Sequence, residues 1–262
     1  MRLWRALVAE LRKALTLPAV WAGAGVAVVG SAALTWLNAT GVRDALLAGR
    51  PQDTAFGSAF DTAFAAMPLG TVGAVVLGVV VMGSEYTTNS TDAGGGRQIS
   101  TTLAAVPGRT TLLVAKAATV ALLVLTAAAL AIPSSLGVAE AVIGAAATST
   151  VPVADAVVRC LGGALYWTLT ALIALAVTVL TRSGVVPLIV LVVNSSLVSV
   201  SLLLTFLTPL AHWLPDMAGR RLFGGVATVD GGLAAGPGAL VMAAWALALL
   251  AVAGVVLRRR DA

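Results

Sequence analysis

The sequence predicts an all-α integral membrane protein, a bundle of six transmembrane helices preceded by an amphipathic interfacial helix. Hydrophobic residues make up 59% of the 262 residues and charged residues only 10%, against roughly 45–50% and about 25% in soluble proteins. The apolar residues gather in runs near the ~20 residues that cross a hydrocarbon core of ~30 Å. Basic residues flank these runs. A disordered chain is excluded because such chains are poor in hydrophobic residues.

Six apolar runs are long enough to be spans. The third contains Lys116, close enough to its start for the ammonium group to extend to the membrane surface. Residues 134–147 either extend this span past Pro133 or lie along the outer interface. A tight turn at 181–184 joins the fourth and fifth spans. The expected spans are 19–37, 64–83, 112–132, 160–181, 184–207 and 238–257.

The loops leave no room for a second domain. The longest have about 30 residues or fewer, and segments below about 40 residues rarely fold alone. Residues 1–262 are therefore expected to form a single transmembrane domain.

The first sixteen residues predict an amphipathic elbow helix. At about 100° per residue, the apolar side chains fall on one side of the helix, the basic ones fall on the other, and Glu10 lies at the edge. Such a helix suits the headgroup layer, and membrane lipid is its expected partner. The apolar side has Leu3, Trp4, Leu7, Val8, Leu11, Ala14 and Leu15, and the basic side has Arg2, Arg5, Arg12 and Lys13.

The basic residues also predict the orientation. With both termini in the cytoplasm, lysine and arginine divide 11 inside to 5 outside, as the positive-inside rule requires. The protein is thus expected in a bacterial inner (plasma) membrane. The outside set is Arg43, Arg50, Arg159, Arg220 and Arg221.

The chain has no sequence signature of catalysis. The P-loop needs a lysine followed by serine or threonine, but Lys13 and Lys116 are each followed by alanine. A lone histidine, His212, and a lone cysteine, Cys160, provide no zinc site. The basic residues form no aromatic-interleaved patch for nucleic acid. We therefore expect no catalytic residue, no metal and no cofactor in this chain, and no nucleic-acid partner.

The fifth predicted span carries an intramembrane polar stripe. Polar groups at this helical spacing either hold helices together or line a substrate path. The stripe consists of Asn194, Ser195, Ser199, Ser201 and Thr205.

The loop between the second and third spans has a distinctive order of residues. Glu85-Tyr86 precede a glycine run that ends at Arg97, and Lys116 opens the next span. Between them lies a mixed polar and apolar segment, Ile99 to Val106, which ends at Pro107-Gly108-Arg109. With this order and its basic N-terminal helix, the chain resembles the membrane (permease) subunits of type-2 ABC exporters, a small six-span bacterial family.

The resemblance implies a function and partners. Two permease copies, as a homo- or heterodimer, would sit on two ABC ATPase subunits, which bind the ATP and magnesium. The chain would form the pathway for a hydrophobic or amphipathic compound, such as a peptide, an antibiotic or a lipid-like molecule. The segment Ile99 to Val106 would be the cytoplasmic helix that docks on the ATPase.

Within this loop, five residues are the expected coupling site. Ile99 and Leu103 would be apolar anchors, and Arg97 and Arg109 would contact the ATPase. Glu85 would pair with one of these arginines at the base of the loop. A secondary transporter and a non-transporting membrane immunity protein remain the alternatives.

Overall fold

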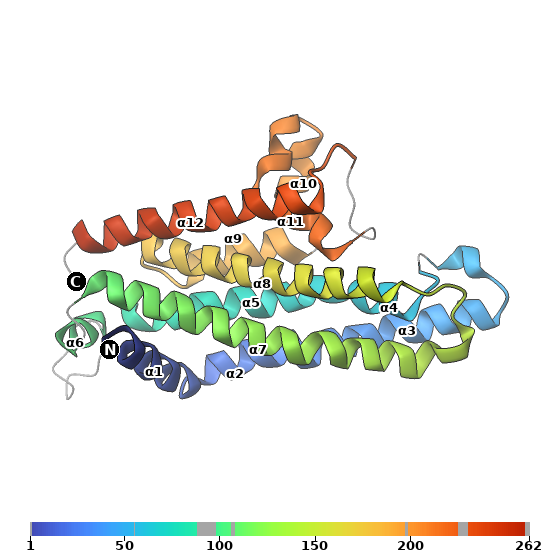
Figure 1. Ribbon diagram of the computed structural model, residues 1–262, viewed down its shortest axis with the longest axis horizontal. Coiled ribbons are helices and arrows are strands. Elements are labelled where there is room, and N and C mark those ends of the chain that lie inside the picture. The colour runs from blue at the N-terminus through green and yellow to red at the C-terminus, as the bar shows by residue number, and fades with distance from the viewer. Residues whose placement is uncertain are drawn as a thin grey trace.

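The computed structural model describes residues 2–54, 56–87, 98–105, 108–196, 199–224 and 230–259, and these residues form helices and connecting turns without strands. The long helices run roughly side by side (Figure 1). In chain order the elements are α1 Arg2–Leu15, α2 Pro18–Gly25, the π-helical turn η1 Val26–Gly30, α3 Ser31–Leu47, η2 Pro51–Asp53, α4 Ala59–Phe64, α5 Met67–Gly83, η3 Ser84–Tyr86, α6 Gln98–Ala105, α7 Arg109–Ile143, η5 Gly144–Ala146, α8 Val153–Thr181, α9 Val185–Ser196, α10 Val200–Thr205, η6 Pro209–Trp213, α11 Pro215–Gly219, η7 Arg220–Phe223 and α12 Ala235–Arg259.

Five helical stretches in the described part of the chain are long and apolar enough to cross a membrane. The all-helical fold and this set of stretches indicate a multi-pass membrane protein. They are Pro18–Leu47, Ala59–Tyr86, Arg109–Ala146, Val153–Thr181 and Ala235–Arg259.

All five spans are longer than expected, and the first and the third exceed their predicted lengths the most. The first helix continues to Leu47, ten residues past the predicted end at 37. α7 has 35 residues and includes Pro133, so it is about 52 Å long at 1.5 Å per residue. Residues 134–147 were expected either to extend the third span or to lie along the outer interface, and in the structure they extend the span to Ala146. Beside the proline, the Ser134 hydroxyl donates to Ala131 O at 3.0 Å.

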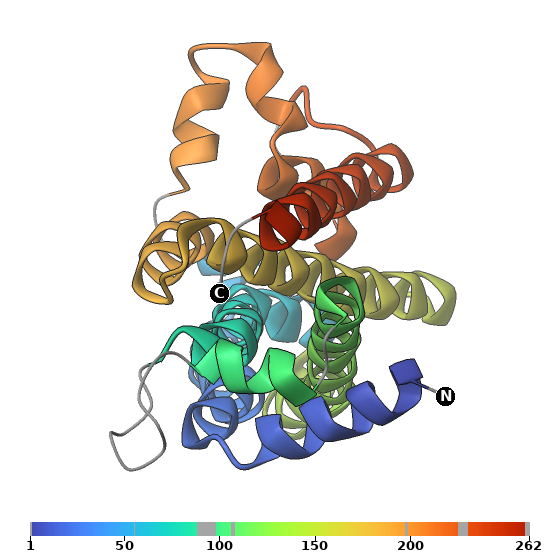
Figure 2. The same cartoon turned by 90° about the vertical axis from the view of Figure 1, so that its left-hand side faces the viewer.

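The predicted fifth span, 184–207, is not one helix. α9 has 12 residues and α10 has 6, and the backbone of Ser199, directly before α10, is extended and not helical. Twelve helical residues extend about 18 Å, which is short of a hydrocarbon core of ~30 Å. The prediction of six continuous spans is therefore wrong at this point. α10 stands away from the long helices (Figure 2).

Glycines allow α5 to lie close to its neighbours at the centre of the bundle. A Cβ added at Gly78 would be 2.2 Å from Ala171 O on α8, and one at Gly73 would be 2.6 Å from Gly23 O on α2. Gly23, Gly73 and Gly78 therefore allow close helix packing, as small residues do in membrane helices. Gly25 differs, because nothing lies within 4 Å of its added Cβ.

α1 and the last turn of α12 lie at the same end of the bundle, which we call the termini end (Figure 1). α6 and the turn between α8 and α9 are at this end as well. α1 packs on α7 and is separate from the spans, as predicted for residues 1–16. Its bundle-facing side consists of Ala6, Glu10 and Ala14, whereas Trp4 and Leu15 are exposed.

Candidate functional site

A buried ionic cluster occupies the termini end of the bundle, between α1, η3 and α7. The ammonium group of Lys116 lies 2.6 Å from Glu10 Oε2 and 2.8 Å from Glu85 Oε1. It also donates to Val81 O at 3.1 Å. The side chain of Lys116 is 1% exposed and that of Glu85 is 0% exposed. Lys116 therefore has three acceptors in place of water.

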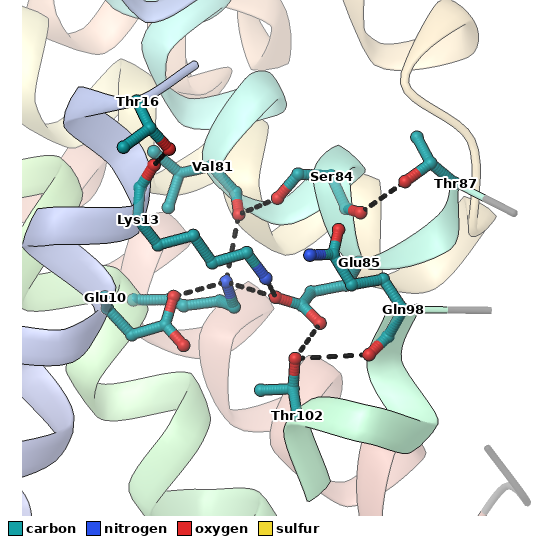
Figure 3. A network of polar contacts seen from close by, with 10 residues as sticks. Glu10, Lys13, Thr16, Val81, Ser84, Glu85, Thr87, Gln98 and Thr102 are labelled. Carbon is teal, nitrogen blue, oxygen red and sulfur yellow. Dashed lines mark hydrogen bonds and ion pairs between the residues drawn. The ribbon is translucent and has the colours of Figure 1, made fainter. Parts of the chain in front are cut away.

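The carboxylate of Glu85 uses both of its oxygens (Figure 3). Oε1 also forms an ion pair with Lys13 Nζ from α1. Oε2 accepts a hydrogen bond from Thr102 Oγ1 on α6 at 2.8 Å. Glu85 thereby connects α1, α6 and α7 at a single carboxylate.

The cluster is neutral and self-contained. It contains both lysines of the chain, Lys13 and Lys116, and two glutamates, Glu10 and Glu85. A buried charge is expensive unless it is paired and hydrogen-bonded. The four residues meet this condition together, so each one holds its neighbours in place.

Two sequence predictions about these residues are wrong. Lys116 does not extend toward the surface but is buried against two carboxylates. Glu10 is not at the edge of an exposed helix but on the side that faces the bundle. The helical wheel treats α1 as an isolated helix, so it does not include the cation that α7 supplies 106 residues later.

The predicted pairing of Glu85 with Arg97 or Arg109 stays a prediction. The cations whose contacts with Glu85 are described are Lys13 and Lys116. Arg109 donates from Nη1 to Leu257 O at 2.8 Å and so connects the start of α7 to the end of α12. Arg97 lies outside the described residues.

α6 is the short helix predicted for this loop. It covers Gln98–Ala105, and Val106 lies outside the described residues. Ile99 is buried at 3% exposure and belongs to the core of this chain, and Leu103 is half-buried against the same core. Ile99 is therefore turned inward and is not available as an apolar anchor for a partner. Ser100 and Thr101 are on the exposed side of α6.

The polar stripe of the predicted fifth span lies at the break between α9 and α10. Asn194 Oδ1 accepts from the backbone N–H of Ser201 at 3.2 Å. Ser199 caps α10 by accepting from Leu202 N and donates to Asp216 Oδ2, both at 3.1 Å. Thr205 donates to Leu202 O at 2.7 Å. The side chain of Ser195 lies outside the described part. In the part of this segment that the structure describes, the polar groups of Asn194, Ser199 and Thr205 bond to backbone near the start of α10, and Ser199 also bonds to Asp216.

A second ion pair lies toward the opposite end of the bundle and was missed by sequence reasoning. Arg159 on α8 lies 2.8 Å from Asp61 Oδ1 on α4 and donates from Nε to Phe223 O at 3.1 Å. Its guanidinium also lies 4.7 Å from the centre of the Phe60 ring. These contacts hold α4 and η7 against α8. The sequence signal that could have pointed to this ion pair is a single arginine, Arg159, directly before an apolar run.

Among the described residues, no group of three or more histidine, cysteine, aspartate and glutamate side chains is arranged for a metal ion. No protein-family model matches the chain, and no curated protein matches it. The functional reading therefore depends on the residues themselves. The strongest site they offer is the ionic cluster that joins α6 to α1 and α7.

Proposed function

We propose that this chain is the membrane-spanning permease subunit of an ATP-driven ABC exporter. Two copies form the pathway for a hydrophobic or amphipathic compound in a bacterial inner membrane. ATP and magnesium are bound by two separate ATPase subunits. The chain itself has no P-loop, because neither lysine is followed by serine or threonine.

The observation that carries the proposal is the attachment of α6. A loop that only connects two spans has no need of a buried ion pair. Here Thr102 of α6 bonds to Glu85, and Glu85 is paired with Lys13 of α1 and Lys116 of α7. A push on α6 is therefore transmitted to α1 and to a spanning helix through short polar contacts. This is the arrangement that a coupling element needs.

The orientation belongs to the same proposal. The termini end contains basic residues from α1, the start of α7, the turn at Arg182 and the last turn of α12. The opposite end has fewer. The positive-inside rule assigns the termini end to the cytoplasm, where a soluble ATPase would meet α6.

The partner-facing surface of α6 is its exposed side. Because Ile99 is inward, the contact falls on Ser100 and Thr101, with the half-buried Leu103 beside them. Arg97 and Arg109 remain candidates for polar contacts with the ATPase. The polar groups at the break between α9 and α10 remain candidates for the substrate path.

Ion-coupled transport is a second candidate, favoured by one observation. Glu10 and Glu85 are both buried, and buried carboxylates are typical of proton relays. Each of them is paired with a lysine, however, as in a structural ion-pair network. Hydrolysis-dependent transport is therefore the stronger reading.

The test is reconstitution with the companion ATPase. The complex purified from native membranes should hydrolyse ATP, and the isolated chain should not. In vesicles, export should require ATP and continue when the proton gradient is collapsed. Thr101→Trp, on the exposed side of α6, should reduce assembly with the ATPase. Thr181→Trp, an exposed threonine in the other turn at this end, is the matched control and should assemble normally. Export driven by a proton gradient without an ATPase would overturn the proposal in favour of secondary transport.

A further inference from the structure

An apolar groove of about 370 Å³ lies on the side of the bundle between α1, α2 and α7. Its floor includes the buried side chains of Val20, Leu77 and Ala127. Its rim includes Trp21 and Leu122, which are exposed. The volume is within the range of pockets that hold small ligands. The groove is therefore large enough to hold a segment of a larger ligand, well beyond the size of a single methyl group.

Among the described side chains of the wall, no N–H or O–H donor is left for a polar ligand. Two described side chains of the wall contain polar groups, and both groups donate to backbone carbonyls. Thr126 Oγ1 donates to Leu122 O at 2.8 Å, and Trp21 Nε1 donates to Leu15 O at 2.9 Å. A polar group placed here would lose its hydrogen bonds to water. The occupant must be a hydrocarbon segment.

The two walls of the groove are held apart by contacts already described. α1 is fixed to α7 on its bundle-facing side, where Glu10 pairs with Lys116. The bond from Trp21 to Leu15 O holds the elbow between α1 and α2. α1 therefore cannot roll toward α2 to fill the groove without breaking the ion pair.

Cations lie beside the groove on the exposed side of α1. Arg12 follows the lining residue Leu11 directly, and Arg5 is about two turns earlier on the same side. Both arginines are exposed. A basic amphipathic helix attracts anionic lipid headgroups. The groove thus joins an apolar wall to a cationic edge.

We propose that the groove binds one acyl chain of an anionic phospholipid, with the headgroup phosphate at Arg12. The lipid completes the packing between the elbow helix and the first and third spans. This inference does not depend on the exporter assignment, since it requires only a membrane protein with this elbow.

Native mass spectrometry of the purified, delipidated chain tests the proposal. Phosphatidylglycerol and phosphatidylcholine with identical acyl chains are titrated separately. One phosphatidylglycerol should be retained, with a preference of about fivefold over phosphatidylcholine, as expected for one basic residue near an anionic headgroup. Arg12→Gln should remove this preference and keep lipid retention. Arg259→Gln, an exposed cation of α12 at the same end, should leave the preference unchanged.

A second pair of variants tests the groove itself. Ala24 lines the groove, so Ala24→Leu should fill it and reduce retention of both lipids. Ala22→Leu, on the exposed side of the same helix, is the matched control and should retain lipid normally. If Ala24→Leu lowers the unfolding temperature, Val28→Phe replaces it as the filling variant. Equal lipid retention in the filled and control variants would overturn the proposal. So would retention of a non-phospholipid compound that the filling variant displaces.

Discussion

Replacing Lys116 by methionine keeps most of the length of the side chain and removes its charge. Glu10 then loses the ammonium group 2.6 Å away, and Glu85 loses one of its two lysine partners. Lys116 is 1% exposed, so water does not compensate for the loss. Removing one member of a buried pair costs about 3–5 kcal/mol, because an uncompensated charge stays buried.

A double-mutant cycle separates this electrostatic cost from the loss of packing. Lys116→Met, Glu10→Gln and the double variant are unfolded by titration with a denaturing detergent in mixed micelles. The loss of unfolding free energy in the double variant should be smaller than the sum of the two single losses by about 1–3 kcal/mol. The reason is that the double variant leaves Glu85 paired with Lys13 and leaves no charge at Glu10. Arg259→Met, at an exposed position in the last turn of α12, is the control and should change stability by about 0.5 kcal/mol or less.

Two results would refute this reasoning. The first is a Lys116→Met variant as stable as the Arg259→Met control. The second is strict additivity of Lys116→Met and Glu10→Gln, which would mean that the two charges do not interact.

Three further predictions follow from the packing and the topology. Gly78→Ala should destabilise the protein by about 1–3 kcal/mol in the same detergent titration, because the new Cβ would be 2.2 Å from Ala171 O. Gly25→Ala, whose Cβ would have nothing within 4 Å, should be tolerated. Equal effects of the two substitutions would contradict the packing of α5 described above. Asn194→Leu should destabilise the protein by about 1–3 kcal/mol, because it leaves the N–H of Ser201 without its acceptor. Thr205→Val, which removes only a bond within α10, should lower the unfolding free energy less. The reverse order would contradict the role given to Asn194 at the start of α10. A membrane-impermeant thiol reagent should label Cys160 in intact cells, since Cys160 is in the first half of α8, toward the end opposite the termini. A chain with Cys160→Ser and Thr181→Cys should be labelled only after the cells are lysed. The opposite labelling pattern would mean that the orientation in the membrane is the reverse of the one proposed.

How far the sequence predicts a structural feature depends on the range of the interaction behind it. The separate N-terminal helix and the location of most spans could be predicted because they follow from local periodicity and apolar runs, whereas the helix of residues 98–105 was expected from the resemblance. The path of α7 through Pro133 could not, because a proline can end a helix or be tolerated within it. The choice depends on neighbours, and α7 packs against α3 and α4 on this part of its length.

The interruption of the predicted fifth span shows the same limit. Residues 184–207 have the hydropathy of one span, yet Asn194 and Ser199 cap the start of a second helix. Serine and asparagine side chains compete with the helix for backbone groups. Ser199 also donates to Asp216 on α11, a partner that the local sequence does not include.

The sequence by itself determined that this chain belongs in a membrane, because apolar content and run length are sums over residues. It also determined the α-helical class and the presence of a basic elbow helix. Only the tertiary structure decided that Glu10, Glu85, Lys13 and Lys116 form one cluster. The physical reason is that a charge becomes buried only when helices distant in the chain pack together, and its partner is then chosen by proximity in space.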